Sequence, residues 1–454
     1  MKRSIEEKLL ADLREWEAGW GEFLRDETLA VEEARLENVA AEFSERMKEN
    51  YPFFHPRYAG QMLKPPHPLA LMAYRAAMSL NPNNHALDGG PATAKMEVES
   101  VAALARMMGY KTHLGHLTSS GTIANLEALW IARSLHPEKG IAFSAGAHYT
   151  HKRMCEVIRA ESFEVPTTDS GRIDCDALEK LLKSGKVGTI VATIGTTSLG
   201  AVDPLHEVVP LARMYHARIH ADAAYGGFFS LLARQEDPLI DPLPFRHLAE
   251  CDSIVVDPHK HGLQPYGCGC ILVRDPSVGR FYKHDSPYTY FTSRELHLGE
   301  ISLECSRPGA SAAALWFTLK CIPLEPSTGL GSILTKTRRA AIDFSRLLAK
   351  SDRFKEFVSP ELDIVSYFPR TEPSTSSLIS AKSQRLFDDA MHHRSHPLFL
   401  ALLQVPSRHL ARIHPEVSAD RELTTILRSV LMKPEHMAFA PQMMKELEEI
   451  AAGG

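Results

Sequence analysis

Two amphipathic helices are predicted in the first fifty residues. Their apolar side chains recur at helical spacing, first at Leu9, Leu10, Leu13, Trp16 and Trp20, then at Val31, Leu36, Val39 and Phe43. Helices with one apolar face need a surface to cover, so we expect them to pack on another part of the chain or on a partner subunit. Residues 51–68 hold five of the 29 prolines and predict a mostly extended loop.

From about residue 90, helical stretches alternate with short β-rich runs. Strands are expected at 140–143, 189–194, 218–221, 253–256 and 270–273. Helices are expected at 96–108, 122–134, 176–183 and 205–216. This alternation predicts a mainly parallel sheet with helices on both faces. Ligands of such sheets bind in the loops at the carboxyl ends of the strands.

The pattern changes again after about residue 310. Helices are expected at 312–319 and 333–348 and a strand at 363–368, which is typical of a smaller α+β domain. We therefore expect a helical segment over residues 1–60, a large domain over 61–320 and a small C-terminal domain over 321–454.

Composition narrows the class of protein. Of the 454 residues, 44% are hydrophobic and 24% charged, which is ordinary for a globular protein. The net charge of −5 argues against nucleic acid as the main partner. No apolar run approaches the roughly 18 residues of a membrane span, and the charged N-terminus lacks the apolar stretch of a signal peptide. We expect a cytoplasmic protein that does not bind membranes.

The seven cysteines are odd in number and irregular in spacing, which indicates free thiols in a reducing compartment. Cys268 and Cys270 are separated by one residue, a spacing that is not typical of zinc sites. No metal site is therefore expected.

The stretch SIVVDPHKHGLQPYGCGCILV, residues 253–273, is the most informative for chemistry. A β-branched strand ends at Val256, and a tight loop then presents Lys260 before a second strand. A lysine at a strand end, enclosed by apolar elements, can serve as a nucleophile. By itself, this stretch is equally compatible with a solvated loop lysine.

A second stretch, RIHADAAYGGFF at 218–229, places Asp222 directly after a strand and before two alanines and two glycines. Small residues allow a flat group to approach the backbone, and a carboxylate there can hold a pyridinium nitrogen protonated. The alternative interpretation is a helix-capping aspartate.

Two further stretches contain candidate binding residues. In LTSSGTIANL, Ser120, Gly121 and Thr122 open a helix, so amides and hydroxyls could cradle a phosphate, although any helix N-terminus looks similar. Neither GxxxxGK[ST] nor GxGxxG is present, which disfavours a P-loop or a dinucleotide site. In AHYTHKRM, the ring of His148 could stack on a flat cofactor, or it could be structural.

These residues follow one another over about 140 positions in the order phosphate cradle, stacking histidine, carboxylate and lysine. In this the chain resembles the group II decarboxylases that depend on pyridoxal 5′-phosphate (PLP). These belong to fold type I and include the aromatic-amino-acid, glutamate and archaeal tyrosine/aspartate decarboxylases. The resemblance extends from about His55 to Arg428. It is most specific in DPHKHG (257–262), HADAAYGG (220–227), ATIGTTSLGAVDP (192–204) and LECSRPGASAAALW (303–316).

The resemblance implies an α/β large domain of the PLP-dependent transferase type, with a mainly parallel seven-stranded sheet. It implies that Lys260 forms the Schiff base, that Asp222 binds the pyridine nitrogen, and that His148 and Ala224 contact opposite faces of the ring. Thr197 would lie near the ring and Asp222. The phosphate would be held by Ser120, Gly121, Thr122, Asp257 and His259.

Other implied roles depend on a second subunit or on the substrate. Gly309 resembles the loop that reaches the phosphate across the interface of a homodimer with shared active sites. Arg428 resembles the arginine that binds the substrate carboxylate, and Tyr288 resembles the tyrosine of the mobile catalytic loop.

The chain departs from the family pattern at two positions. Ser120 stands where the family cradle often has its first glycine, which we expect to leave phosphate binding intact. His261 stands where the residue after the lysine is often tryptophan, so His261 becomes a candidate for substrate binding. His55, Arg57 and Tyr58 are further candidates, and the identity of the amino acid stays open.

The expected reaction is that of a carboxy-lyase, in which an L-amino acid loses CO₂ and becomes an amine. Asp222 would keep the ring nitrogen cationic so that the carbanion is stabilised, and Lys260, His148 or Tyr288 would return a proton to Cα. One alternative is another fold-type I chemistry, such as a transaminase or a carbon–carbon lyase. A second is a non-catalytic interaction protein on a decayed enzyme fold, against which the retention of Lys260, Asp222 and His148 argues.

Overall fold

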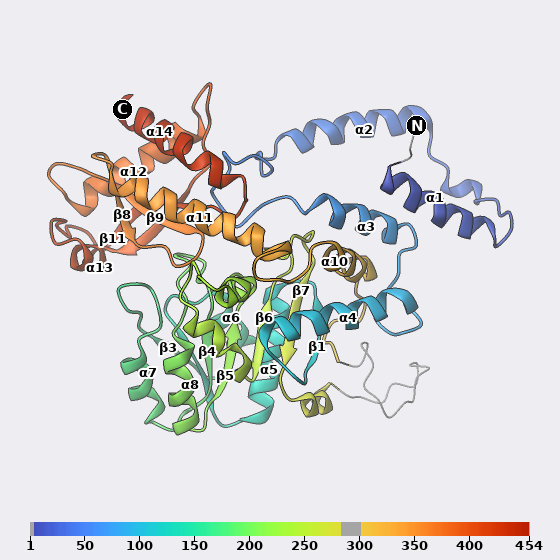
Figure 1. The fold of residues 1–454 in the computed structure, drawn as a ribbon, viewed down its shortest axis with the longest axis horizontal. Coiled ribbons are helices and arrows are strands. Elements are labelled where there is room, and N and C mark those ends of the chain that lie inside the picture. Colours follow the sequence, from blue (N-terminus) through green and yellow to red (C-terminus); the bar gives the residue numbers. More distant parts are fainter. Residues whose placement is uncertain (1–3, 283–300, 454) are drawn as a thin grey trace.

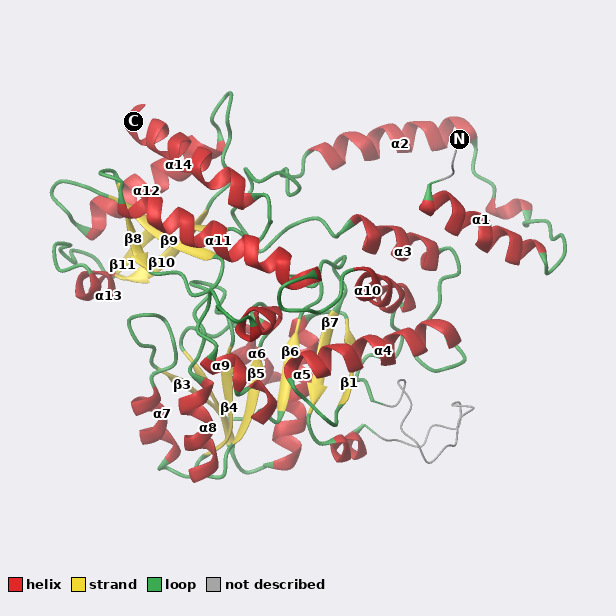
Figure 2. Cartoon of the chain, viewed as in Figure 1, coloured by secondary structure: helices red, strands yellow, loops and turns green. Residues whose placement is uncertain are grey.

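The computed structural model describes residues 4–282 and 301–453. It contains two β-sheets, each covered by helices, and an N-terminal helical extension that lies apart from both (Figures 1 and 2). The first sheet lies within residues 114–273 and the second within 354–430. This agrees with the expected α/β architecture and its smaller C-terminal part, while the domain limits themselves stay a prediction.

The larger sheet has seven strands in the order β1-β7-β6-β5-β4-β2-β3, and only β7 runs antiparallel to its neighbours. The strands are β1 (Leu114–Thr118), β2 (Gly140–Ser144), β3 (Ser162–Val165), β4 (Val187–Thr193), β5 (Arg218–Asp222), β6 (Ser253–Val256) and β7 (Gly269–Val273). The five strands expected from the sequence are confirmed within two residues at each end. The pattern did not predict β1 or β3.

Both faces of this sheet are buried, as expected of a parallel sheet. Ile254 and Val256 belong to the core on one face, whereas Val255 between them packs into a separate cluster on the other face. The helices around the sheet are α4 (Pro91–Met108), α5 (Gly121–Leu135), α6 (Thr150–Val157), α7 (Cys175–Leu182), α8 (Leu205–Met214) and α9 (Leu243–Arg246). Short 3-10 helices occur at η1 (Glu27–Leu29), η2 (Gly227–Arg234), η3 (Leu248–Glu250) and η4 (Pro276–Phe281).

Capping residues define the ends of several helices. The side chain of Asp174 accepts a hydrogen bond from the amide of Ala177 at the start of α7. Helix α4 begins with Pro91 in its first turn and ends at Gly109, whose φ of 88° is the left-handed conformation that glycine adopts readily.

The smaller sheet is antiparallel, with the order β10-β11-β9-β8. Its strands are β8 (Phe354–Val358), β9 (Ile364–Pro369), β10 (Ala401–Pro406) and β11 (Leu423–Val430). The surrounding helices are α11 (Gly329–Ala349), α12 (Ser376–Met391), α13 (Ser407–Ile413) and α14 (His436–Gly453). Of these strands, only β9 was expected from the sequence.

Of the N-terminal helices, α1 (Ile5–Ala18) lies beside α3 (Pro68–Met78), whereas α2 (Glu33–Lys48) extends away from the two sheets (Figure 1). Neither α1 nor α2 contains a buried residue. Helix α3 also packs against α10 (Gly309–Cys321). Within the described residues, no helix is long and apolar enough to cross a membrane, and no cluster of three or more His, Cys, Asp or Glu could hold a metal ion.

Candidate active site

One cavity of about 190 Å³ opens where the parallel strands end. The loops after β1, β2, β4, β5 and β6 supply its walls, as expected for ligand sites of such sheets. The residues predicted from the sequence that line it are Ser120, Gly121, Thr122, His148, Thr197, Asp222, Ala224, Asp257, His259 and Lys260. Strand order therefore brings five separate stretches of sequence to one point.

Asp222, the last residue of β5, is 5% exposed and forms the most tightly held polar contact of the cavity. Its Oδ2 lies 2.7 Å from Nε2 of His151, and its Oδ1 accepts a hydrogen bond from the amide of Ala224. Burial by itself would raise the pKa of Asp222. The hydrogen bond and charge of His151, together with Lys260, instead hold it well below its usual range. Asp222 is therefore an anion at neutral pH.

His151 was not selected in the sequence analysis, although it lies only three residues after His148 in AHYTHKRM. It belongs to the first turn of α6 and is fully buried. A second buried histidine, His220, lies beside it with the ring centroids 6.4 Å apart. Burial lowers the pKa of His220 to about 3, and its two ring nitrogens contact Asn125 and Ser253. Asp222 thus has one direct imidazole partner, and a second, neutral imidazole lies next to that partner.

Lys260 follows β6 by four residues and contacts a second carboxylate. Its Nζ lies 3.1 Å from Oδ2 of Asp257, which is also 3.5 Å from Nε2 of His259. Asp257 is buried, and within the described residues its Oδ1 has no hydrogen-bond partner. The amine is therefore held at the cavity by a short ionic contact.

His148 forms another part of the cavity wall. Its Nδ1 lies 2.8 Å from the hydroxyl of Thr150, which fixes the rotation of the ring. Burial lowers the pKa of His148, with Lys260 acting in the same direction and Asp222 opposing it. The imidazole is therefore neutral at pH 7 and can lie flat against a cofactor ring.

The predicted phosphate cradle is the N-terminus of α5. The hydroxyl of Ser120 accepts a hydrogen bond from the amide of Ile123, so Ser120 is the N-cap. The amides of Gly121 and Thr122 precede the first intrahelical hydrogen bonds, so they are available to an anion. A Cβ on Gly121 would lie 2.5 Å from Oδ2 of Asp257, so only glycine fits at this position without moving the carboxylate.

Two of the predicted residues, Arg428 and Gly309, are not part of the cavity wall. Arg428 on β11 is 4% exposed, and its Nη2 donates a hydrogen bond to the carbonyl oxygen of Thr197 at 2.7 Å. Gly309 begins α10 and packs near Asn84 and Thr93, and its amide binds the carbonyl of Pro82. Neither residue lines the cavity within this single chain.

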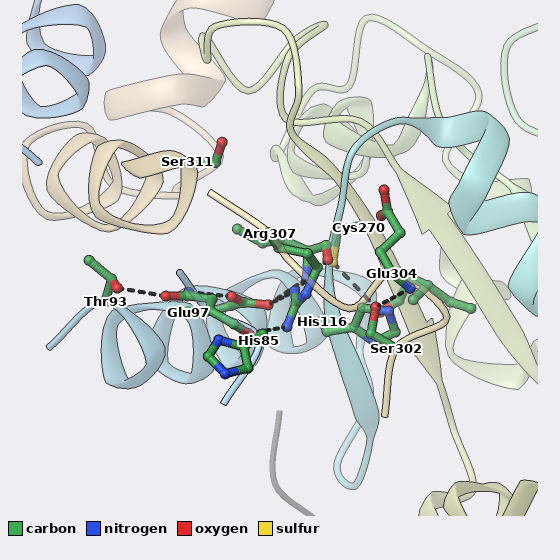
Figure 3. A network of polar contacts seen from close by, with 12 residues as sticks. His85, Thr93, Glu97, His116, Cys270, Ser302, Glu304, Arg307 and Ser311 are labelled. Atoms are coloured by element: carbon green, nitrogen blue, oxygen red, sulfur yellow. Dashed lines mark hydrogen bonds and ion pairs between the residues drawn. The ribbon is translucent and has the colours of Figure 1, made fainter. Parts of the chain in front are cut away.

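The segment that precedes Gly309 is held by a buried ion pair (Figure 3). Arg307 donates to Oε1 of Glu97 at 2.5 Å and to the carbonyl of Leu117 on β1 at 2.7 Å. Glu304 accepts a hydrogen bond from the amide of Ser119 at 2.8 Å. Figure 3 shows Arg307 next to Glu97 and Glu304 farther along the same segment. This segment therefore runs directly beside the strand that leads into the cradle.

The remaining predicted residues are placed differently. His261 is fully buried, with its ring 4.7 Å from that of Tyr225 and 5.0 Å from that of Phe229. It follows Lys260 in the chain but does not line the cavity. Tyr288 lies outside the described residues. The proposed roles of His261 and Tyr288 therefore stay predictions.

The cavity fits pyridoxal phosphate in both shape and chemistry. Asp222 is a buried anion suited to a pyridinium nitrogen, and Lys260 presents an amine for the aldehyde carbon. The N-terminus of α5 presents amides for the phosphate. The close approach of Gly121 and Asp257 is the kind of cradle that a Cβ would obstruct.

Comparison with known proteins agrees with this geometry. The family model of the pyridoxal-dependent decarboxylase conserved domain matches residues 24–368. An L-tyrosine decarboxylase of Enterococcus faecium is 27% identical, covering 81% of this chain and 78% of the relative. A probable L-tyrosine/L-aspartate decarboxylase of Methanothermobacter thermautotrophicus is 30% identical, covering 68% and 82%.

Solved structures share the fold. The structure of mouse CSAD has a TM-score of 0.78 at 20% identity, covering 99% of this chain and 93% of that one. Oryza sativa TDC with PLP and tryptamine also has a TM-score of 0.78, at 18% identity, covering 98% and 92%. The chain belongs to the pyridoxal-dependent decarboxylase family, and it is an amino acid decarboxylase that uses pyridoxal phosphate.

Proposed function

We propose that Lys260 binds the cofactor covalently, that Asp222 holds its pyridine nitrogen protonated, and that Arg428 binds the α-carboxylate of an L-amino acid. The observation that carries this proposal is the single cavity into which Lys260, Asp222, His148 and the N-terminus of α5 all project. The fold-type I alternatives were transamination and carbon–carbon cleavage. Both are disfavoured because the chain belongs to a decarboxylase family.

When bound, pyridoxal phosphate supplies an electron sink for the electron pair that the departing carboxylate leaves on Cα. Asp222 remains anionic beside His151, so it stabilises a positive charge at the nitrogen that faces it. His148, neutral and held by Thr150, would cover one side of the ring, and Ala224 would cover the other.

The proton for Cα must come from a group at the cavity. Lys260 would be available for this whenever its amine is not bonded to the cofactor. His148 and Tyr288 are the other candidates that we retain. Asp257, 3.1 Å from the amine, would hold the lysine close to the reacting carbon while it is protonated.

The substrate side chain is constrained by where the cations lie. Both η nitrogens of Arg57 bind the carboxylate of Glu446 at 2.7 Å, so this arginine is already neutralised. Burial keeps His261 neutral by lowering its pKa well below the usual range. These two residues therefore do not favour an acidic substrate over an aromatic one such as L-tyrosine.

Borohydride reduction of the holoenzyme tests the central assignment. The protein should be yellow, and reduction should fix the cofactor to the peptide that contains Lys260. The buried Lys433 serves as an internal control, because it lies outside the cavity and should stay unlabelled. Release of CO₂ from each L-amino acid, with L-tyrosine and L-aspartate first, then identifies the substrate. Label on any lysine other than Lys260 would overturn the proposal.

We also propose a cytoplasmic homodimer. All seven cysteines are free, which is consistent with a reducing compartment. Apolar side chains of the N-terminal segment are exposed in the single chain, among them Val39 and Phe43 on α2 and Trp20, Phe23 and Leu24 between α1 and α2. A groove of about 710 Å³ between α1, α3, α4 and α10 is lined mainly by apolar residues. A second copy of the chain would cover these surfaces, and Gly309 would then approach the neighbouring cofactor.

A further inference from the structure

A short segment of the small domain, Leu362 and Asp363, inserts between two loops of the cofactor site. A Cβ on Gly195 would lie 3.0 Å from Cδ1 of Leu362, and one on Gly226 would lie 3.1 Å from it. Gly195 follows β4 and lines the cavity, whereas Gly226 closes the turn that begins at Asp222. The two glycines therefore leave room for this segment directly behind the site.

The carboxylate of Asp363 connects both sides of the cofactor site. Its Oδ1 accepts a hydrogen bond of 2.6 Å from the hydroxyl of Tyr225, a residue of the cavity wall. Its Oδ2 lies 3.4 Å from Nε2 of His261, the residue after Lys260. Asp363 and His261 are both fully buried.

Burying the ionisable side chains of Asp363 and His261 costs folding free energy. Burial raises the pKa of Asp363 to about 6, although Tyr225 and Lys64 oppose it, and burial lowers the pKa of His261 well below its usual range. Within the described residues, Oδ2 of Asp363 and both ring nitrogens of His261 form no hydrogen bond of acceptable geometry, although Oδ2 and Nε2 lie 3.4 Å apart. Incompletely satisfied polar groups destabilise the folded state, so packing alone does not explain this arrangement.

The same aspartate is tied to the strand that carries Arg428. Its backbone carbonyl accepts a hydrogen bond of 2.8 Å from the amide of Leu431 at the end of β11. Directly after Asp363, β9 pairs with β11 so that Ser366 lies opposite Arg428. Arg428 in turn binds the carbonyl of Thr197, in the loop that contains Gly195. Asp363 thus contacts the loop of Asp222, the loop of Lys260 and the strand of Arg428.

We propose that Asp363 is a positioning residue, which holds the small-domain strand of Arg428 in register with the Asp222–Tyr225 turn through its hydrogen bond to Tyr225. The inference rests on the proposed function, because it takes Arg428 as the residue that binds the substrate carboxylate. The proposal predicts a selective effect on ligand binding. Loss of the contact should impair recognition of the carboxylate more than binding of the cofactor.

Two stable ligands measure that selectivity without knowledge of the substrate side chain. Phosphopyridoxyl-glycine and phosphopyridoxyl-methylamine differ only in the carboxylate that Arg428 would bind. Their affinities for the apoprotein can be measured by calorimetry. The ratio of the two dissociation constants reports the position of Arg428, and the affinity of the methylamine conjugate reports the rest of the site.

We expect Asp363→Ala and Tyr225→Phe to lower the preference for the glycine conjugate about tenfold, the effect of losing one hydrogen bond of about 1.4 kcal/mol. Asp363→Asn should stay within about twofold of wild type, because the amide oxygen still accepts from Tyr225. The control is Glu361→Gln. Glu361 also crosses between the domains, binding Arg172 at 2.8 Å, but it lies outside the cavity wall. This variant should keep the preference.

The possible results are distinguishable. Equal preference in wild type, Asp363→Ala and Tyr225→Phe overturns the positioning role and leaves the proposed function intact. An equal loss in Glu361→Gln also overturns it, because any loosening between the domains would then suffice. If wild type itself shows no preference, the role of Arg428 is wrong and the inference falls with it, whereas labelling of Lys260 is unaffected. If Asp363→Ala does not fold, Tyr225→Phe and Asp363→Asn decide the question.

Discussion

At the scale of single residues, the site depends on how one buried carboxylate keeps its charge. Asp222 is almost inaccessible to water. A carboxylate buried there without a partner would be strongly destabilised in its charged form. The nearby imidazole of His151 provides the compensating contact at 2.7 Å. A substitution of His151, which lies outside the cavity wall, should therefore act on the cofactor through Asp222, if Asp222 binds the pyridine nitrogen as proposed.

We predict that His151→Phe lowers the turnover number roughly 10- to 100-fold, because a hydrogen bond to a charged group contributes about 1.5–3 kcal/mol. His151→Gln should restore much of the rate, since its amide can donate from a position close to Nε2. Steady-state assays at saturating cofactor compare the two variants, and thermal unfolding of the apoproteins shows whether each is folded. A His151→Phe enzyme with wild-type turnover would exclude this role.

At the scale of elements, the N-terminus of α5 packs closely against the loop after β6. Gly121 begins the helix, and Asp257 begins the loop that ends in Lys260. The absence of a side chain at Gly121 lets the Asp257 carboxylate approach the helix end, where the helix dipole stabilises negative charge. The proposed phosphate cradle and the lysine are thus linked by the close approach of Gly121 and Asp257.

Gly121→Ala should weaken binding of pyridoxal phosphate about tenfold or more, because the new methyl group would overlap the carboxylate of Asp257. Alanine favours the helix over glycine by up to about 1 kcal/mol. The variant should therefore lose cofactor affinity without a matching loss of stability. Fluorescence titration of the apoprotein measures the affinity. The control is Ser119→Ala, which shortens an exposed side chain in the same turn and should bind normally. If Gly121→Ala and Ser119→Ala bind pyridoxal phosphate equally well, the methyl group at position 121 does not obstruct the site and the prediction is wrong.

At the scale of the whole molecule, the isolated chain leaves a large apolar surface uncovered. Leu36, Val39, Phe43 and Met47 recur along one side of α2, each more than half exposed. Figure 1 shows this helix extending beyond the two sheets. Exposed apolar faces of this kind are typical of interfaces between subunits.

Val39→Asp combined with Phe43→Asp should therefore convert the proposed dimer to a monomer at micromolar concentration, because two charges would have to be buried at the interface. Sedimentation velocity measures the mass, and the monomer should lose activity if Gly309 serves the neighbouring site. Ala41→Asp introduces a charge on the opposite side of the same helix and should leave the dimer intact. A wild-type chain that is monomeric and active in dilute solution would contradict the proposed assembly.

The sequence determined those features that depend on local pattern. Strands with β-branched runs, such as 253–256, could be located because a buried strand leaves a short apolar run between polar loops. The short strands β1 (LGHLT) and β3 (SFEV) were missed because glycine, histidine or glutamate interrupts their pattern. Lys260, Asp222 and the proposed cradle could be selected because each lies at the end of a strand, in the loop that follows one, or at the start of a helix.

The contacts between these stretches were decided only by the tertiary structure. His151 and Asp222 are 71 positions apart, and Tyr225 and Asp363 are 138 apart. Strand order places β4, β5 and β6 side by side, and the docking of the small sheet then brings Asp363 behind Tyr225. Periodicity reports which face of an element is buried, but not which partner buries it. Partners are chosen by the packing of whole elements, because only a complete set of neighbours removes water from a carboxylate and supplies the hydrogen bonds that replace it.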